Sequence, residues 1–322
     1  MRSLRWVGLL ALYIGAQAIG LALANPFRSA GLASGSNPQS PTAPIAIILI
    51  IVIAPLFILY LARQKGGIGA LRHLILLAIA GALYITLYAT FSVLWPVAYL
   101  QPPYAAEIVA VPALLLAAIA SAGLYFALLV EPKWYIVDLA GFLAAGALVA
   151  IRGISFAILP AFILLIALMI YDAIAVYRTK HMVSLADVVT EMKLPILMVM
   201  PDSIGYDYQA APPLAEQRAQ PVEERSALFM GLGDVVIPGT LVVSAFVWLP
   251  TTPSLLGLGA DLWVGIGALV GSLLGYAFLM RLVMRGNPQA GLPFLNGGAI
   301  LGYVVAYLLL FHSASLGFTV AL

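Results

Sequence analysis

The sequence contains no cysteine. This absence excludes disulfide bonds, thiol nucleophiles, iron–sulfur centres and thiolate zinc sites, and it leaves the redox compartment undetermined. Histidine is nearly as scarce: His73, His181 and His312 lie far apart along the chain, and no HExxH, GxSxG or P-loop motif is present. The sequence therefore gives no support to a zinc hydrolase, a serine hydrolase or a nucleotide hydrolase.

Charged residues are also few. They make up 9% of the chain, against 63% hydrophobic residues, which is too few to cover the surface of a soluble protein of this size and indicates an integral membrane protein. A helix needs about 20 apolar residues to cross the hydrocarbon of a bilayer. The sequence predicts an all-α, polytopic membrane protein with nine transmembrane helices, at residues 5–24, 44–62, 74–95, 108–130, 134–151, 154–177, 228–250, 262–280 and 292–311.

Lysine and arginine fall almost entirely on one side of this predicted topology. If the N-terminus is cytoplasmic, only Arg28 and Arg152 lie outside. The other thirteen basic residues then lie on the cytoplasmic side: Arg2, Arg5, Arg63, Lys65, Arg72, Lys133, Arg178, Lys180, Lys193, Arg218, Arg225, Arg281 and Arg285. Because cytoplasmic loops carry the excess of basic residues, the N-terminus is predicted inside and the C-terminus outside. These basic residues form no nucleic-acid-binding patch.

The spans divide the chain into three parts. Residues 1–177 form an N-terminal part of six transmembrane helices, 178–227 a cytoplasmic loop, and 228–322 a C-terminal part of three helices. The first span resembles a signal peptide, but its apolar run is long for that role, and a retained helix is favoured. The loop reads as a flexible cytoplasmic linker, with a gate over the active site or an autocleaved segment as the alternatives.

Three aspartates lie within predicted spans, where a carboxylate needs a partner or a function. Asp172 lies six residues before Arg178, and Asp234 lies six residues after Leu228. At about 1.5 Å per residue, both carboxyl groups are expected roughly 9 Å inside the cytoplasmic boundary, on neighbouring antiparallel helices. They are therefore predicted to meet, whereas Asp138 is expected to have a structural or interfacial role.

A pair of carboxyl groups suits aspartyl hydrolysis. Two such groups in one site cannot both ionise cheaply, so one keeps a proton. The ionised member can take a proton from water while the protonated member donates to the scissile carbonyl, which requires no metal or cofactor. Buried aspartates also serve as proton or cation relays, so an ion channel or secondary transporter is the alternative function.

The residues around the two aspartates resemble known motifs. Tyr171 precedes Asp172, and Gly231, Leu232 and Gly233 precede Asp234. In this order, on the sixth and seventh of nine spans, they resemble the YD and GxGD motifs of the presenilin and signal peptide peptidase family of intramembrane aspartyl proteases. The resemblance implies a presenilin-like fold and an endopeptidase, with Asp172 and Asp234 as its catalytic dyad.

The family's third motif, PAL at the start of the last span, is matched in part. Gly291, Leu292 and Pro293 follow Ala290, so the leucine and the next proline match while the first two positions differ. The resemblance gives this segment the role of holding an unwound substrate. It also implies substrates that are transmembrane helices of membrane proteins in the lipid bilayer. The predicted orientation favours the presenilin branch, and the resemblance implies a prokaryotic, archaeal-type presenilin homologue in the cell membrane. Homo-oligomerisation is left open.

Overall fold

The computed structural model describes residues 2–35, 37–64, 66–94, 104–212, 214–221, 224–285 and 289–318. Within these ranges the chain forms nine long apolar helices: α1 (Arg2–Ser29), α2 (Ile45–Ala62), α3 (Gly67–Leu94), α4 (Tyr104–Val130), α5 (Trp134–Ser155), α6 (Ile158–Tyr177), α9 (Leu232–Trp248), α10 (Ala260–Val283) and α11 (Leu292–Phe311). Each overlaps most of the apolar run predicted for it, because a helix satisfies its own backbone hydrogen bonds in lipid. Residue 95, the predicted end of the third span, lies outside the described ranges.

Eight of these nine described helices are long and apolar enough to cross a membrane, and α9 is shorter. Its 17 residues span about 26 Å, less than the roughly 30 Å of a bilayer core. The predicted seventh span began at residue 228, and this start is wrong. Residues 228–231 belong instead to strand β2 (Ala227–Gly231), so a strand and a short helix together replace one long helix.

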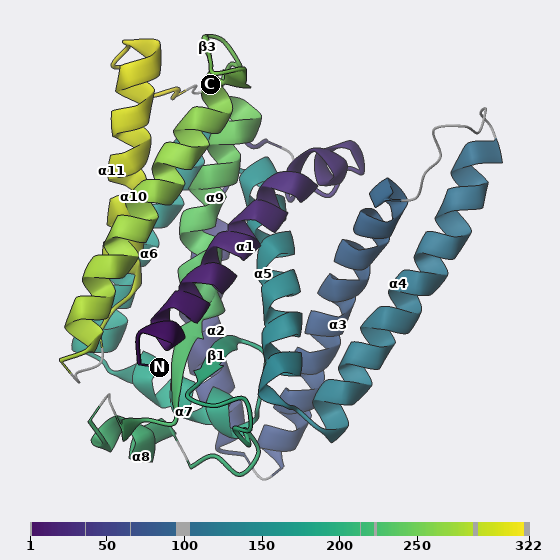
Figure 1. Ribbon diagram of the computed structural model, residues 1–322, viewed down its shortest axis with the longest axis vertical. Helices are drawn as coiled ribbons and strands as arrows, with labels where there is room; N and C mark the ends of the chain where they lie inside the picture. Colours follow the sequence, from purple (N-terminus) through teal and green to yellow (C-terminus); the bar gives the residue numbers. More distant parts are fainter. Residues whose placement is uncertain are drawn as a thin grey trace.

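Helix α9 occupies the centre of the molecule. It contacts α1, α5, α6, α10 and α11, and its residues Val235, Leu241 and Val243 are fully buried. The α3–α4 pair lies to one side (Figure 1), and α2 has only Pro55 buried, whereas most of α9 is buried. Because α9 carries Asp234 in its first turn, the central helix of the core positions this carboxylate.

The two ends of the described chain lie at opposite ends of the molecule (Figure 1). The N-terminal end of α1 lies beside β1 (Leu197–Pro201) and α7 (His181–Glu191), whereas the C-terminal end lies near β3 (Ser254–Leu255). A chain that crosses a membrane an odd number of times must end on the opposite side from its start. The arrangement therefore agrees with nine crossings.

Helix α1 is part of the core. Tyr13 is fully buried, and the side-chain amide of Gln17 donates a hydrogen bond of 2.8 Å to the carbonyl of Val235 in α9. Removing α1 would leave this central helix exposed. The packing of the core thus depends on α1.

The segment predicted as a flexible linker contains regular structure, so that interpretation is corrected. Helix α7 is followed by β1, by the short helix α8 (Leu214–Ala219) and by β2. Strands β1 and β2 pair antiparallel, with Leu197 opposite Gly231 and Pro201 opposite Ala227. A second small hairpin joins β3 to β4 (Leu258–Gly259) before α10.

Candidate active site

The predicted site residues gather around one cavity of about 420 Å³ near the β1–β2 end of the molecule. Helices α2, α6, α7 and α9, both strands of the β1–β2 hairpin and the segment before α11 contribute to its wall. Its lining includes eight of the nine predicted residues: Tyr171, Asp172, Gly231, Leu232, Gly233, Asp234, Gly291 and Leu292. The ninth, Pro293, lies outside and lines an apolar groove between α10 and α11.

Asp172 projects from α6 toward the segment that precedes α11. Its carboxyl oxygen Oδ2 accepts a hydrogen bond of 3.0 Å from the backbone N–H of Leu292, and the N–H of Gly291 is a second donor. The side chain is almost fully buried. Two backbone groups of one segment therefore fix the orientation of this carboxyl group.

Asp234 lies in the first turn of α9, three residues after the helix N-cap Gly231. Its carboxyl group accepts a hydrogen bond from the N–H of Gly231, the arrangement by which the third residue of a helix satisfies an N-cap donor. The two carboxyl groups, one from α6 and one from α9, therefore line the same cavity, and both lie against the segment that precedes α11.

Gly291 lies against both carboxyl groups. Its N–H faces Asp172, and a Cβ atom at this position would stand 2.7 Å from Oδ1 of Asp234. That separation is shorter than an ordinary van der Waals contact, so a residue larger than glycine at position 291 would collide with the carboxyl group of Asp234. At Gly291, where the sequence differs from the family's PAL motif, the backbone thus approaches Asp234 closely.

Gly233 leaves open space beside Asp234. It is exposed, and a Cβ atom here would meet no heavy atom within 4 Å. Glycine at this position is therefore not required by packing. The open space beside Gly233 is part of the cavity and lies next to the carboxyl group of Asp234.

Tyr171 is held by residues that the sequence did not single out. Its hydroxyl lies 2.9 Å from Nε2 of His181 at the start of α7, and Nδ1 of His181 lies 2.6 Å from Oγ1 of Thr179. These contacts fasten α7 to the end of α6 beside Asp172. Nothing in the residue pattern separated His181 from an ordinary loop histidine, because its partner depends on where the chain turns after α6.

Tyr177 is a second residue that sequence reasoning missed. Its hydroxyl donates to Oε1 of Gln289 at 2.9 Å and accepts from the N–H of Ala290 at 3.2 Å. It therefore ties the end of α6 to the segment that contacts Asp172. A tyrosine at the end of a span is typical of the membrane interface, so its position in sequence carried no specific signal.

Asp138 lies outside this cavity. Its Oδ1 accepts a hydrogen bond of 2.6 Å from the backbone N–H of Val199 in β1, and the side chain is buried. This contact agrees with the structural role expected for it. Within the described ranges, no group of three or more His, Asp or Glu side chains is placed to hold a metal ion.

Comparison with known proteins identifies the family. Residues 10–312 match the family model described as signal-peptide peptidase, presenilin aspartyl protease. Two solved structures of a presenilin family intramembrane aspartate protease, in the C222 and P2 space groups, are similar to this chain. They share 32% and 34% identity with it, each covers 94% of it, and 99% and 97% of their own chains are covered.

The TM-scores of these two structures are 0.61 and 0.60. The comparison with curated proteins found no match. Neither matched description is that of a channel or a transporter, the alternative raised by the buried aspartates. The chain therefore belongs to the signal peptide peptidase and presenilin family of aspartyl proteases, and it is a multi-pass membrane hydrolase with the presenilin-type fold.

Proposed function

We propose that Asp172 and Asp234 form the catalytic dyad of an endopeptidase that hydrolyses peptide bonds within the transmembrane segments of membrane proteins. One observation carries this proposal. Carboxyl groups from two helices distant in sequence line the same cavity, and both lie against Gly291. The cavity is within the usual size range of a small-molecule or peptide site, about 300–1,000 Å³.

The dyad divides the chemistry between its two members. Two carboxyl groups this close do not both ionise, so one carries a proton at rest. The ionised member takes a proton from water, which attacks the scissile carbonyl, while the other donates its proton to the carbonyl oxygen. The roles reverse when the tetrahedral intermediate collapses and the amine leaves. Because the pair titrates as a unit, the resting proton belongs to both residues.

Space around the dyad supports an extended substrate. A helical peptide bond is shielded, since its carbonyl is hydrogen-bonded within the helix, so the substrate must unwind locally before attack. Gly233 leaves room beside Asp234 for such a backbone. We assign the holding of the unwound segment to Gly291, Leu292 and Pro293, because the first two already present backbone N–H groups to Asp172.

We also infer a location in the cell membrane of a prokaryote, and the distribution of charge supports a cytoplasmic N-terminus and a C-terminus outside. Arg5, Arg178 and Lys193 all belong to the end of the molecule that carries the dyad. Basic residues collect on the cytoplasmic side of membrane proteins. Water would thus reach the cavity from the cytoplasm, and substrates would span with their N-terminus outside.

Cleavage of a single-span substrate by the purified full-length protein in detergent tests the dyad. We expect Asp172→Asn and Asp234→Asn each to reduce cleavage to background, because an amide can neither accept nor supply the proton. Asp261→Asn is the matched control: Asp261 is equally buried but lies at the start of α10, outside the cavity. Gel-filtration profiles and melting temperatures establish that each variant is folded.

Cleavage that survives the loss of Asp172 or Asp234 would refute the assignment. Proton or cation flux in liposomes would then be measured next. Cleavage lost in all three variants would also count against it, because the effect would then follow from burial alone.

A further inference from the structure

The β1–β2 hairpin leads directly into the first turn of α9. Strand β2 ends at Gly231, which is also the N-cap of α9, and Gly231 pairs with Leu197 at the corresponding end of β1. The N–H of Leu232 continues the pairing, because it donates a hydrogen bond of 3.0 Å to the carbonyl of Ile196. A movement of the hairpin would therefore also move Gly231, whose N–H donates a hydrogen bond to Asp234.

Asp138 of α5 holds the middle of this hairpin. The N–H of Val199 donates to Oδ1 of Asp138 at 2.6 Å, so Asp138 covers a donor on β1 that is not used in pairing with β2. Unpaired N–H groups along a strand edge are otherwise open to competing partners. A bond to a carboxylate is among the stronger hydrogen bonds, with a net contribution of about 1.5–3 kcal/mol.

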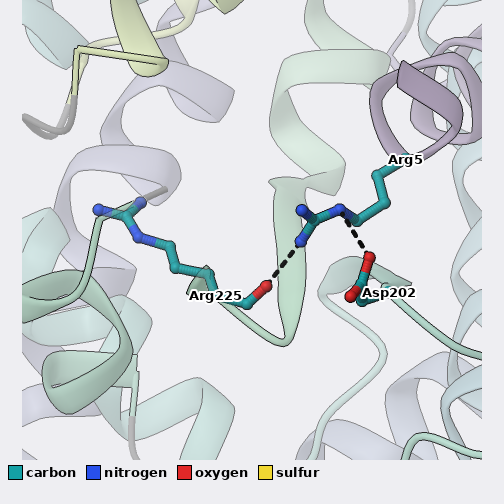
Figure 2. A network of polar contacts seen from close by, with 3 residues as sticks. All are labelled: Arg5, Asp202 and Arg225. Atoms are coloured by element: carbon teal, nitrogen blue, oxygen red, sulfur yellow. Dashed lines mark hydrogen bonds and ion pairs between the residues drawn. The ribbon is translucent and has the colours of Figure 1, made fainter. Parts of the chain in front are cut away.

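Arg5 of α1 lies between Asp202 and Arg225 (Figure 2), at the end of the hairpin opposite Gly231. Its Nη1 donates to the carbonyl of Arg225 at 2.6 Å, and its Nε lies 3.5 Å from Oδ1 of Asp202. Asp202 follows β1 directly, and Arg225 lies two residues before β2, where Ser226 accepts a hydrogen bond of 2.9 Å from the N–H of Asp202. One buried guanidinium thus joins both strands to α1.

We propose that Asp138 and Arg5 are positioning residues that hold the β1–β2 hairpin at two points and so fix the place of Asp234. The proposal rests on the assignment of Asp234 to the dyad. Neither residue lines the cavity, and each bonds the backbone of the hairpin or of its connection. Helices α1 and α5 pack on each other and on β1, so the two holding points belong to one framework (Figure 1).

The energetics favour positioning over a purely stabilising role. Asp202 is more than half exposed, so its ion pair with Arg5 adds little, about 0–1 kcal/mol. The bond to Asp138 is buried and that from Arg5 is partly buried, and both are directional and fix where the strands lie. A displacement of about 1 Å in a catalytic group costs on the order of 100-fold in rate.

The test compares Asp138→Leu with Asp138→Asn. Leucine copies the branched shape of aspartate but removes the acceptor, whereas the amide oxygen of asparagine can still accept from Val199. We expect Asp138→Leu to lower kcat at least tenfold with KM changed less than threefold, and Asp138→Asn to restore kcat to within about threefold of wild type. Amide hydrogen exchange at residues 197–200 and 227–231 should quicken at least tenfold in the leucine variant only.

Ser155→Ala is the matched control. Ser155 lies at the other end of α5, is fully buried, and accepts a hydrogen bond of 2.7 Å from the N–H of Ser34. Its loss removes a partly buried long-range bond from the same helix without touching the hairpin. We expect Ser155→Ala to lower the melting temperature and to leave kcat and hairpin exchange unchanged. A lower kcat in Asp138→Leu would then not be explained by a general loss of stability.

We expect Arg5→Met likewise to lower kcat and to quicken hairpin exchange. This variant replaces Asp138→Leu if the latter does not fold. Faster exchange in the hairpin with unchanged kcat would overturn the proposal, and so would unchanged exchange in both variants. The exchange measurement needs no substrate. It therefore separates failure of the hairpin restraint from failure of the dyad, which Asp172→Asn and Asp234→Asn test on their own.

Discussion

Replacing Gly233 with alanine adds one methyl group beside Asp234 at a place where the protein itself offers no obstacle. No heavy atom lies within 4 Å of the added Cβ, and the position is exposed. Alanine exceeds glycine in helix propensity by about 0.8–1 kcal/mol in a helix interior, with less gain in the first turn. The free energy of unfolding should therefore stay the same or rise by up to about 1 kcal/mol.

Activity should respond in the opposite direction. The free space beside Gly233 is where an extended substrate would approach Asp234, and a methyl group there would displace it by about 1 Å. Displacements of this size cost on the order of 100-fold in rate, so we expect kcat/KM to fall 10- to 100-fold. Mass spectrometry of the products should also show shifted cleavage positions, because the substrate must sit in another register.

The matched control is Gly123→Ala in α4. Gly123 is also a helical, exposed glycine with no heavy atom near its Cβ position, and it lies away from the cavity. Thermal stability and cleavage kinetics in detergent are measured for both variants. Wild-type rates and cleavage positions in Gly233→Ala would refute the idea that substrate occupies this space.

Three further predictions follow from single contacts. Gly271→Ala should destabilise the protein by about 1–3 kcal/mol, seen as a lower temperature of thermal inactivation, because its Cβ would overlap the carbonyl of Gly298 where α10 meets α11. Tyr171→Phe should cost about 1 kcal/mol and loosen α7, seen as faster hydrogen exchange after His181, since it removes their hydrogen bond; unchanged exchange would contradict the contact. Leu292→Glu should reduce cleavage at least tenfold by placing a charge at the cavity wall, and a normal rate would count against its role in holding substrate.

Part of the site was predictable because it depends on local and one-dimensional properties. Hydropathy located the spans, since backbone groups in lipid must bond within their own helix. Depth along those spans then predicted that Asp172 and Asp234 would meet, because two antiparallel neighbours place equal depths side by side. Both lie at one cavity in the structure. The depth predicted for Asp234 nevertheless assumed a helix at residues 228–231, where the chain forms a strand.

The β1–β2 hairpin shows why that start was missed. Residues 228–230 are Leu, Phe and Met, an apolar run that a helix and a strand share equally in hydropathy. Their partners, residues 198–200, lie beyond a connection of 25 residues, Asp202 to Ser226, so the pairing is invisible to any local pattern. The same distance explains why the segment between the sixth and seventh spans was predicted as a linker.

The sequence by itself determined that the protein lies in lipid, how many apolar helices it has and which two acidic residues line the cavity. Each of these follows from the cost of polar groups in lipid. Only the tertiary structure decided how that pair is held. Leu292 donates to Asp172, and Arg5 and Asp138 bond the hairpin that ends beside Asp234. These contacts join residues from 60 to more than 200 positions apart, and their geometry exists only after the helices have packed.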